Sequence, residues 1–432
     1  MNCRTPAYYR TLFLLAPLLV LATEPASAGR GLLLNAYGQE QYGMAGADIA
    51  LARDSHAVNN NPAGLTQIDN KHASGFVFLY GAPAASYQDE LGNDEGLSDP
   101  YGAIFGASAA TRLTHLPDTV AAIGLYVQGG FGIGHDQLHT RVGTRDEISA
   151  NIAYNKLVAG LGWKARDNLS LGLSLGIGLS QGRQQQLPNT SDFSDPDNPV
   201  IGARFDGGEG VSLGAIVGVQ YQATPDWTLA LSYTSQNQLR LSGGTTTLNL
   251  EGAGLGRVKY ARARLDGLAL PQTWDLGVAW RLRPEWIVVA EYNWVNYSAA
   301  LSNTRLRATM PNTAGAEPVL DAVTPLNWRD QHVYALGVTY ERDANTSVRG
   351  GLLGMSDPIR KSSASPSLNV YQKLGVMGGF QRRWSNQWAF DLVLEYQLRQ
   401  DSHYSNPGLN LGTQSTNRYA TVVMVVGLSR SW

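Results

Sequence analysis

The sequence predicts an all-β protein, a transmembrane antiparallel β-barrel of about 14 strands with an N-terminal plug. Three observations support this fold class. Charged residues make up only 16% of the 432 positions and 48 residues are glycine, whereas soluble domains average about 25% charged residues and about 7% glycine. Many stretches alternate apolar with small polar residues. No run of 18 apolar residues follows position 30, which excludes a helical membrane protein.

The alternation is plainest in residues 169–180, where leucine or isoleucine alternates with serine or glycine throughout. This stretch is longer than the ~9–11 residues of a tilted membrane strand. In similar stretches the acidic residues fall only on the small polar phase, where a wet lumen would accept them: Asp275, Glu291, Asp391 and Glu395.

A soluble β-sandwich would show the same alternation, so the ten tryptophans decide between the two folds. All ten lie near the ends of expected strands, with Trp274, Trp294 and Trp328 at the ends away from the short turns. Two aromatic girdles are typical of a barrel in a bilayer.

Short and long connections also alternate along the chain. Six short turns and seven longer polar connections give fourteen strands, and the even number places both ends of the barrel on the periplasmic side. The longer connections lie near 81–100, 131–149, 183–207, 242–270, 299–326, 357–368 and 403–415. We expect strands near 71–80, 101–113, 118–130, 150–165, 169–182, 208–222, 227–241, 271–283, 285–298, 327–341, 346–356, 369–384, 387–401 and 416–432.

The first 28 residues read as a signal peptide, with a basic start, a short apolar stretch and Ala26-Ser27-Ala28 as the cleavage motif. Its removal would also remove Cys3, the single cysteine. Residues 29–70 lack strand alternation and suggest short helices and turns, which we interpret as a hatch that fills the barrel of residues 71–432. A periplasmic tail is the alternative for this segment.

Several short motifs carry a family resemblance. They occupy residues 43–47, 52–55, 61–65, 270–274, 283–286, 328–330, 334–340, 348–351 and 356–358. With the motif Asn61-Pro62-Ala63 in the hatch, they resemble the FadL/TodX family of outer-membrane transporters for long-chain fatty acids and aromatic hydrocarbons. The long connections match that family least.

The resemblance implies passive uptake of hydrophobic compounds by a monomer in the bacterial (Gram-negative) outer membrane. We expect contact with outer-membrane lipid and lipopolysaccharide, a hydrophobic small-molecule substrate, and insertion by the barrel-assembly machinery. We expect no cofactor, no metal site and no nucleic-acid partner, since the net charge is only -2. A general porin for small solutes and a surface adhesin or receptor remain alternatives, and the residues do not separate fatty acids from aromatic hydrocarbons.

Basic residues are the candidates for substrate binding. Arg329 is the first candidate, because it shares the expected inward phase of its strand and an arginine can bind a carboxylate with two hydrogen bonds. The resemblance also implies that it matches a basic position that fatty-acid transporters use. Lys156 also falls on the inward phase. Arg183 falls on the outer phase by count, so a role for it requires a bulge or a loop turn.

Glycines in the third strand predict a lateral opening. Gly129, Gly130, Gly132 and Gly134 occupy four of six positions, and glycine within a strand marks bulges and bends. They would interrupt the ladder and let substrate pass sideways into the bilayer, as the resemblance also implies. A flexible strand end that enters a loop is the alternative.

No catalytic set is predicted. The Gly-x-Ser-x-Gly patterns at 172–176 and 210–214 lie inside alternating strands, whereas a nucleophile elbow needs a strand-turn-helix context. His135 and His139 have a metal-binding spacing but lack a neighbouring glutamate and follow a glycine-rich strand end.

Overall fold

A computed structural model describes residues 29–368, 373–384 and 387–432. The expected signal peptide and the turn at 385–386 lie outside the described residues. The barrel itself is a closed antiparallel sheet of fourteen strands, as predicted. They are β1 (Lys71–Gly81), β4 (Tyr101–Leu113), β5 (Leu116–His139), β6 (Arg145–Arg166), β7 (Leu169–Asp192), β8 (Val200–Thr224), β9 (Trp227–Thr234), β14 (Thr273–Arg283), β15 (Trp286–Val295), β18 (Gln331–Asp343), β19 (Thr346–Met355), β20 (Leu374–Arg383), β21 (Trp388–Tyr404) and β22 (Ser415–Ser431).

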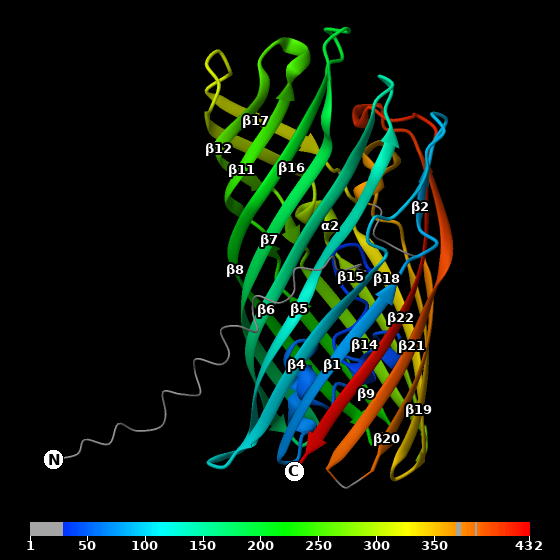
Figure 1. Ribbon diagram of the computed structural model, residues 1–432. Coiled ribbons are helices and arrows are strands. Elements are labelled where there is room, and N and C mark those ends of the chain that lie inside the picture. The colour runs from blue at the N-terminus through cyan, green and yellow to red at the C-terminus, as the bar shows by residue number, and fades with distance from the viewer. Residues whose placement is uncertain (1–28, 369–372, 385–386) are drawn as a thin grey trace, which may run out of the picture.

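The sheet closes where β22 pairs with β1 from His72 and Ser431 to Gly81 and Val422. Figure 1 shows the red β22 beside the blue β1. At the lower end of this seam, Lys71 and Trp432 exchange two backbone hydrogen bonds of 3.1 Å. Closure leaves the barrel without an unpaired edge at this seam, which is what a strand structure in lipid requires.

The two faces of the strands follow the sequence alternation. Leu175 of β7 is 62% exposed, while its neighbour Ser174 is buried. The acidic residues Glu291, Asp391 and Glu395 are buried on the inner face, as their phase predicts. The periplasmic tryptophans are exposed on the outer face, but Trp328 is 2% exposed and belongs to the interior rather than to a girdle.

Much of the chain that we expected to be extracellular loop is strand. The strands β5 to β8 run on beyond the predicted ends. Further pairs form above them: β2 (Ser86–Gln88) with β3 (Asp94–Gly96), β10 (Asn237–Gln238) with β13 (Ala269–Leu270), and the series β11 (Leu241–Leu250), β12 (Gly256–Asp266), β16 (Asn303–Pro311) and β17 (Val319–Pro325). In Figure 1 this series rises from β8 at the upper rim. Backbone groups outside the bilayer pair here with one another instead of with water.

Short helices complete the described structure. The hatch contains α1 (Gln39–Gly43), η3 (Ser55–Val58) and η4 (Pro62–Gln67), all within the barrel. The extracellular connections carry α2 (Tyr297–Ala300), η5 (Glu251–Ala253), η6 (Lys361–Ser363), η7 (Pro366–Leu368) and η8 (Pro407–Leu409). In the described part of the chain, no helix has the length and apolar character needed to cross a membrane.

Candidate substrate path

A β-bulge in β5 reverses which side chains face the lumen. Val127 pairs with Asn155 and Gly129 with Tyr154, so Gln128 is the extra residue between them. Because one inserted residue exchanges the two faces of a strand, Phe131 and Ile133 are buried in the lumen above the bulge. Gly130, Gly132 and Gly134 consequently take the outer phase. Gly130 has a φ of +133°, and a Cβ there would lie 2.0 Å from the Ile152 carbonyl oxygen, so only glycine fits.

Above the bulge, β5 also loses its partner on one side. The ladder between β4 and β5 runs only from Gly106 and Tyr126 to Leu113 and Leu116. In the described residues, 127–133 have no ladder partner on β4, and the next contact is the hydrogen bond of 2.9 Å from the Ser98 amide to the Gly134 carbonyl. The four glycines lie at this interruption, which is on the β4 side; the β5–β6 ladder continues to His139.

The first residues of the hatch lie against the lumen side of the bulge. Leu33 forms a β-bridge with Gly129, and the Gly130 amide donates to the Leu32 carbonyl at 3.0 Å. The Leu32 amide donates to the Tyr297 hydroxyl at 2.8 Å, and Leu32 is 1% exposed. The N-terminal segment therefore separates the interruption in the wall from the barrel interior.

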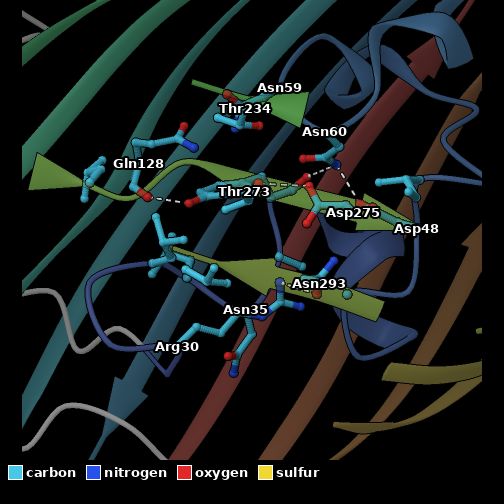
Figure 2. Close-up of a pocket in the computed structure, with 18 of the residues that line it drawn as sticks. Arg30, Asn35, Asp48, Asn59, Asn60, Gln128, Thr234, Thr273, Asp275 and Asn293 are labelled. Carbon is cyan, nitrogen blue, oxygen red and sulfur yellow. Dashed lines mark hydrogen bonds between the residues drawn. The ribbon is translucent and has the colours of Figure 1, made fainter. Parts of the chain in front are cut away.

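A cavity of about 80 Å³ lies behind this segment (Figure 2). Leu33, Leu34, Tyr37 and Leu270 give it an apolar side. Leu270 belongs to the large cluster of buried apolar side chains that includes Phe131, Ile152, Tyr154, Leu241 and Trp328. The polar side of the cavity is formed by Arg30, Asn35, Asp48, Asn59, Asn60, Gln128, Lys156, Asp275, Glu291 and Asn293.

Of the three basic candidates, only Lys156 lines this cavity. It is 2% exposed, and its Nζ donates to Asn59 Oδ1 at 3.0 Å, so its predicted inward orientation is confirmed. A residue that the sequence did not suggest, Arg30, joins it: Nη1 donates to Asn293 Oδ1 at 3.1 Å, while Nε and Nη2 have no hydrogen-bond partner among the described residues.

The first candidate, Arg329, lies outside this cavity. The strand β18 begins only at Gln331, so its alternation does not reach Arg329, which is exposed. Its Nη2 donates to the carbonyls of Asp357 and Ile359 at 3.3 and 3.5 Å. Arg183 keeps the outer phase of β7 and is also exposed, beside Asn151 of β6. Neither side chain lines the cavity.

The motif Asn61-Pro62-Ala63 fastens the hatch to the wall. Asn61 is fully buried; its Oδ1 accepts from the Ala63 amide at 3.2 Å, and its Nδ2 donates to the carbonyls of Ile49 and Val219 at 2.9 and 3.3 Å. The motif packs against three glycines that lie side by side on β6, β7 and β8. Gly162 pairs with Gly172, and Gly172 pairs with Gly218. A Cβ on Gly218 would lie 1.9 Å from Asn61 Oδ1, and a Cβ on Gly172 would lie 2.2 Å from the Ala63 amide nitrogen. Gly172 therefore allows close packing of the hatch motif and is not part of a nucleophile elbow.

Replacing Asn61 with alanine should loosen the hatch, because the change leaves two buried carbonyls without this donor and removes the cap of η4. We expect a loss of roughly 1–3 kcal/mol of hatch binding. Single-channel recordings should show larger conductance, and uptake of hydrophobic compounds should fall while the barrel stays folded. Asn93→Ala is the control, since Asn93 is a buried asparagine with similar bonds in an extracellular loop. Conductance and uptake equal to those of the control would contradict this role.

A series of ion pairs anchors the other side of the hatch to the barrel wall. Arg349 of β19 donates to Asp391 of β21 at 2.7 Å and lies 3.5 Å from Glu40 of the hatch. Glu40 also accepts from Arg53, which reaches Glu341 of β18 at 3.1 Å. Burial alone would raise the pKa of Glu40, but Arg53 and Arg349 outweigh it and lower this pKa to about 2. The hatch carboxylate therefore stays charged between two cations.

Two further wall carboxylates bind the hatch through its neutral groups. Glu291 accepts from the amides of Asp48 and Ile49 at 2.8 and 3.0 Å. Glu395 accepts from Asn35 at 2.7 Å and from the Tyr42 hydroxyl.

The sequence predicts that these acids face the lumen, but it does not indicate the roles of Leu32, Gln128 and Arg349. For Arg349 a signal was present, because it lies on the inward phase of a strand close to strands with inward acids.

The comparisons with known proteins agree with this architecture. Residues 18–431 match the family described as outer membrane protein transport protein (OMPP1/FadL/TodX). No curated protein sequence matches the chain.

Solved structures with the same fold include two toluene transporters and a FadL homologue. The Ralstonia pickettii toluene transporter TbuX is 18% identical, with a TM-score of 0.73 over 92% of this chain and 99% of that one. The P. putida toluene transporter TodX is 16% identical, with a TM-score of 0.75 over 92% and 99%. A Pseudomonas aeruginosa FadL homologue is 16% identical, with a TM-score of 0.72 over 93% and 99%. The fold, the enclosed hatch and the match across nearly the whole chain together show that the protein belongs to the OMPP1/FadL/TodX family of outer-membrane transport proteins.

Proposed function

We propose that the protein is a passive channel that carries hydrophobic compounds across the outer membrane of a Gram-negative bacterium and releases them sideways into the bilayer. The observation that supports this most is the interruption between β4 and β5, which lies beside the lumen cavity. A solute that leaves an apolar lumen for lipid does not enter water, and each exposed CH₂ would cost about 0.8 kcal/mol there.

The same cavity suggests that the described conformation is closed. A cavity known to bind benzene in a protein interior measures about 150 Å³, whereas this cavity measures about 80 Å³. Leu32 and Leu33 lie between the cavity and Gly129. Their displacement from the bulge is therefore the step that would both enlarge the binding site and open the path to the wall.

The polar side of the cavity favours a substrate with an acidic end. TbuX and TodX are toluene transporters by name, but toluene offers a buried ammonium group no hydrogen-bond acceptor, only the cation–π attraction of its ring face. Within the described residues Lys156 has three donors and one hydrogen-bond partner, Asn59, and a buried charge with unpaired donors is costly. We infer that the carboxylate of a fatty acid or of a similar amphipathic acid meets Lys156 and that its apolar part lies along Leu34 and Leu270.

Uptake into cells that lack other channels of this type tests the transport proposal. Cells with the protein should take up long-chain fatty acids or aromatic hydrocarbons faster than cells without it, and small hydrophilic sugars should gain nothing. Equal acceleration of sugars would favour a general porin. Mass spectrometry of compounds that copurify with the barrel would identify the substrate class directly.

Replacing Lys156 with methionine should separate acidic from neutral substrates. The change keeps the length of the side chain and removes its charge, so we expect fatty-acid binding to weaken by about 1.5–3 kcal/mol, the range for a hydrogen bond to a charged group. Toluene binding should change little. Arg329→Met is the matched control because Arg329 is exposed and outside the cavity. Calorimetric titration that finds equal losses for acids and hydrocarbons would show that Lys156 only supports the fold.

A further inference from the structure

One face of the extracellular sheet concentrates positive charge. The sheet runs in the order β8, β11, β12, β16, β17. Its inner face buries Val258, Tyr260, Ala263, Leu265 and Ala308 over the lumen. Its outer face exposes seven basic side chains. Arg257 pairs with Glu251 at 3.3 Å, and we call the other six the basic face: Arg204, Lys259, Arg262, Arg264, Arg305 and Arg307.

The register of the sheet brings these six residues together. Thr247 of β11 pairs with both Arg204 and Lys259. Arg264 pairs with Arg307, and Asp266 with Arg305, across β12 and β16. Neighbouring strands lie about 4.8 Å apart, so Arg264 and Arg307 are closer together than the Debye length of ~8 Å at physiological salt. Arg204 and Lys259 lie two strand spacings apart, on either side of β11. Like charges at these separations repel one another unless anions lie between them.

The carboxylates of this face neutralise only part of the charge. Asp266 pairs with Arg264 at 2.7 Å, and Asp206 pairs with Arg204. Asp321 is shared between Arg305 at 2.6 Å and Arg307 at 3.5 Å. Within the described residues, Lys259 and Arg262 have no carboxylate partner. The face is thus net positive in a chain whose overall charge is -2.

The height of the basic face above the membrane suggests which anion it meets. On β8, the exposed apolar residues Leu213 and Val211 mark the lipid-facing surface, and Arg204 lies seven positions before Val211, towards the extracellular end of the strand. Seven residues extend a strand by roughly 23 Å, or about 18 Å of height at a tilt near 40°. The basic face therefore stands above this lipid-facing surface, at the level of the sugars and phosphates of the outer leaflet.

We propose that the basic face is a binding site for the phosphate groups of the outer-leaflet lipopolysaccharide. Guanidinium groups bind phosphate with two parallel charge-assisted hydrogen bonds. Lys259 and Arg262 supply the free donors, and the arginines that share aspartates supply additional positive potential. Because the face uses cations of the protein itself, this contact needs no divalent ion between two anions.

The experiment compares two variants with the same change in charge. Lys259→Gln with Arg262→Gln alters the basic face, and Arg166→Gln with Arg342→Gln alters exposed arginines at the periplasmic turns. The purified full-length barrel in detergent is titrated with lipopolysaccharide that carries both lipid A phosphates, and native mass spectrometry counts the bound molecules. We expect the first variant to bind at least about tenfold more weakly, with EDTA present or absent, and the control to bind as the unmodified protein does.

Three further titrations identify the ligand. Dephosphorylated lipopolysaccharide, phosphatidylglycerol and inorganic phosphate should each bind weakly and equally to both variants. Equal lipopolysaccharide binding by both variants, or binding that disappears with EDTA, would overturn the proposal. Undiminished binding of the dephosphorylated form would overturn it as well, and tighter binding of inorganic phosphate than of lipopolysaccharide would assign the face to a soluble anion instead. Thermal unfolding of both variants checks that the barrel is intact.

Discussion

Replacing Arg349 with methionine is expected to detach the hatch from the barrel wall. The side chain of Arg349 is 1% exposed and that of Asp391 is fully buried, and they form an ion pair with a 2.7 Å hydrogen bond. Methionine fills a similar volume but leaves Asp391 and one side of Glu40 without a cation. Removing one partner of a buried pair costs about 3–5 kcal/mol, more than the loss expected from the Asn61 variant.

Thermal unfolding and single-channel conductance measure this effect. We expect a lower unfolding temperature of the hatch and a conductance close to that of an unplugged barrel. The double variant Arg349→Met with Asp391→Leu is the control, because it removes both buried charges and should recover most of the stability. If the double variant is no more stable than the single one, the uncompensated charge is not the cause.

The pH dependence gives a separate check on the same series of ion pairs. The pKa of Glu40 is lowered to about 2 from its ordinary value of 4.5. A carboxyl group with a lowered pKa stabilises the folded state fully above its ordinary pKa, and this contribution disappears as the pH falls towards the lowered value. Conductance of the unmodified protein should therefore stay low at pH 5 and rise only in strongly acidic solution.

Deleting Gln128 is expected to abolish release into the bilayer. Without the extra residue, the strand would continue in one phase, and Phe131 and Ile133 would move from the lumen to the outer face. Gly130 and Gly132 would then face the lumen, and the hatch would lose the bridge between Leu33 and Gly129. We expect a folded barrel, because the β5–β6 ladder supplies the same hydrogen bonds in the new register.

Uptake of a labelled substrate measures the result, and binding to the purified barrel is measured beside it. Deletion of Asp197 is the control, because it shortens an exposed turn between β7 and β8 by one residue and leaves β5 unchanged. Uptake at the normal rate by the Gln128 deletion would exclude the bulge from the exit path. The bulge offers a cleaner test than a cysteine at Gly130, where any side chain would collide with the Ile152 carbonyl.

The sequence predicted the features that depend on alternation alone. The number of barrel strands follows from the alternation of short and long connections, and the inward phase of Glu291, Glu395 and Lys156 follows from a period of two. The bulge at Gln128 could not be predicted in the same way, because an inserted residue changes the phase without changing the composition. The glycines indicate where β5 is irregular, but they do not indicate which side chains face the lumen beyond the bulge.

The features that alternation does not predict also have physical reasons. Arg329 lies two residues before the start of β18, so the alternation of that strand does not set the direction of its side chain. The polar outer faces of the extracellular strands resemble loops in sequence, although 256–266 contains alternating basic and apolar residues. The ion pair of Arg349 and Asp391 joins two strands that are not adjacent to each other in sequence, and no local pattern reveals such a contact.

The contacts of the hatch with the far end of the chain also constrain the order of assembly. The bond from Asn35 to Glu395 joins residues 360 positions apart, and the strand that carries Glu395 is the last but one along the chain. Contacts that close such long loops are slow to establish. The part of the hatch with η3 and η4 contacts β4 to β8 and can pack on the first half of the sheet, whereas Asn35 and Glu40 meet Glu395 and Arg349 only when β21 and β19 are present. A chain truncated before β21 should therefore expose an open sheet edge and a hatch that is attached at one end only.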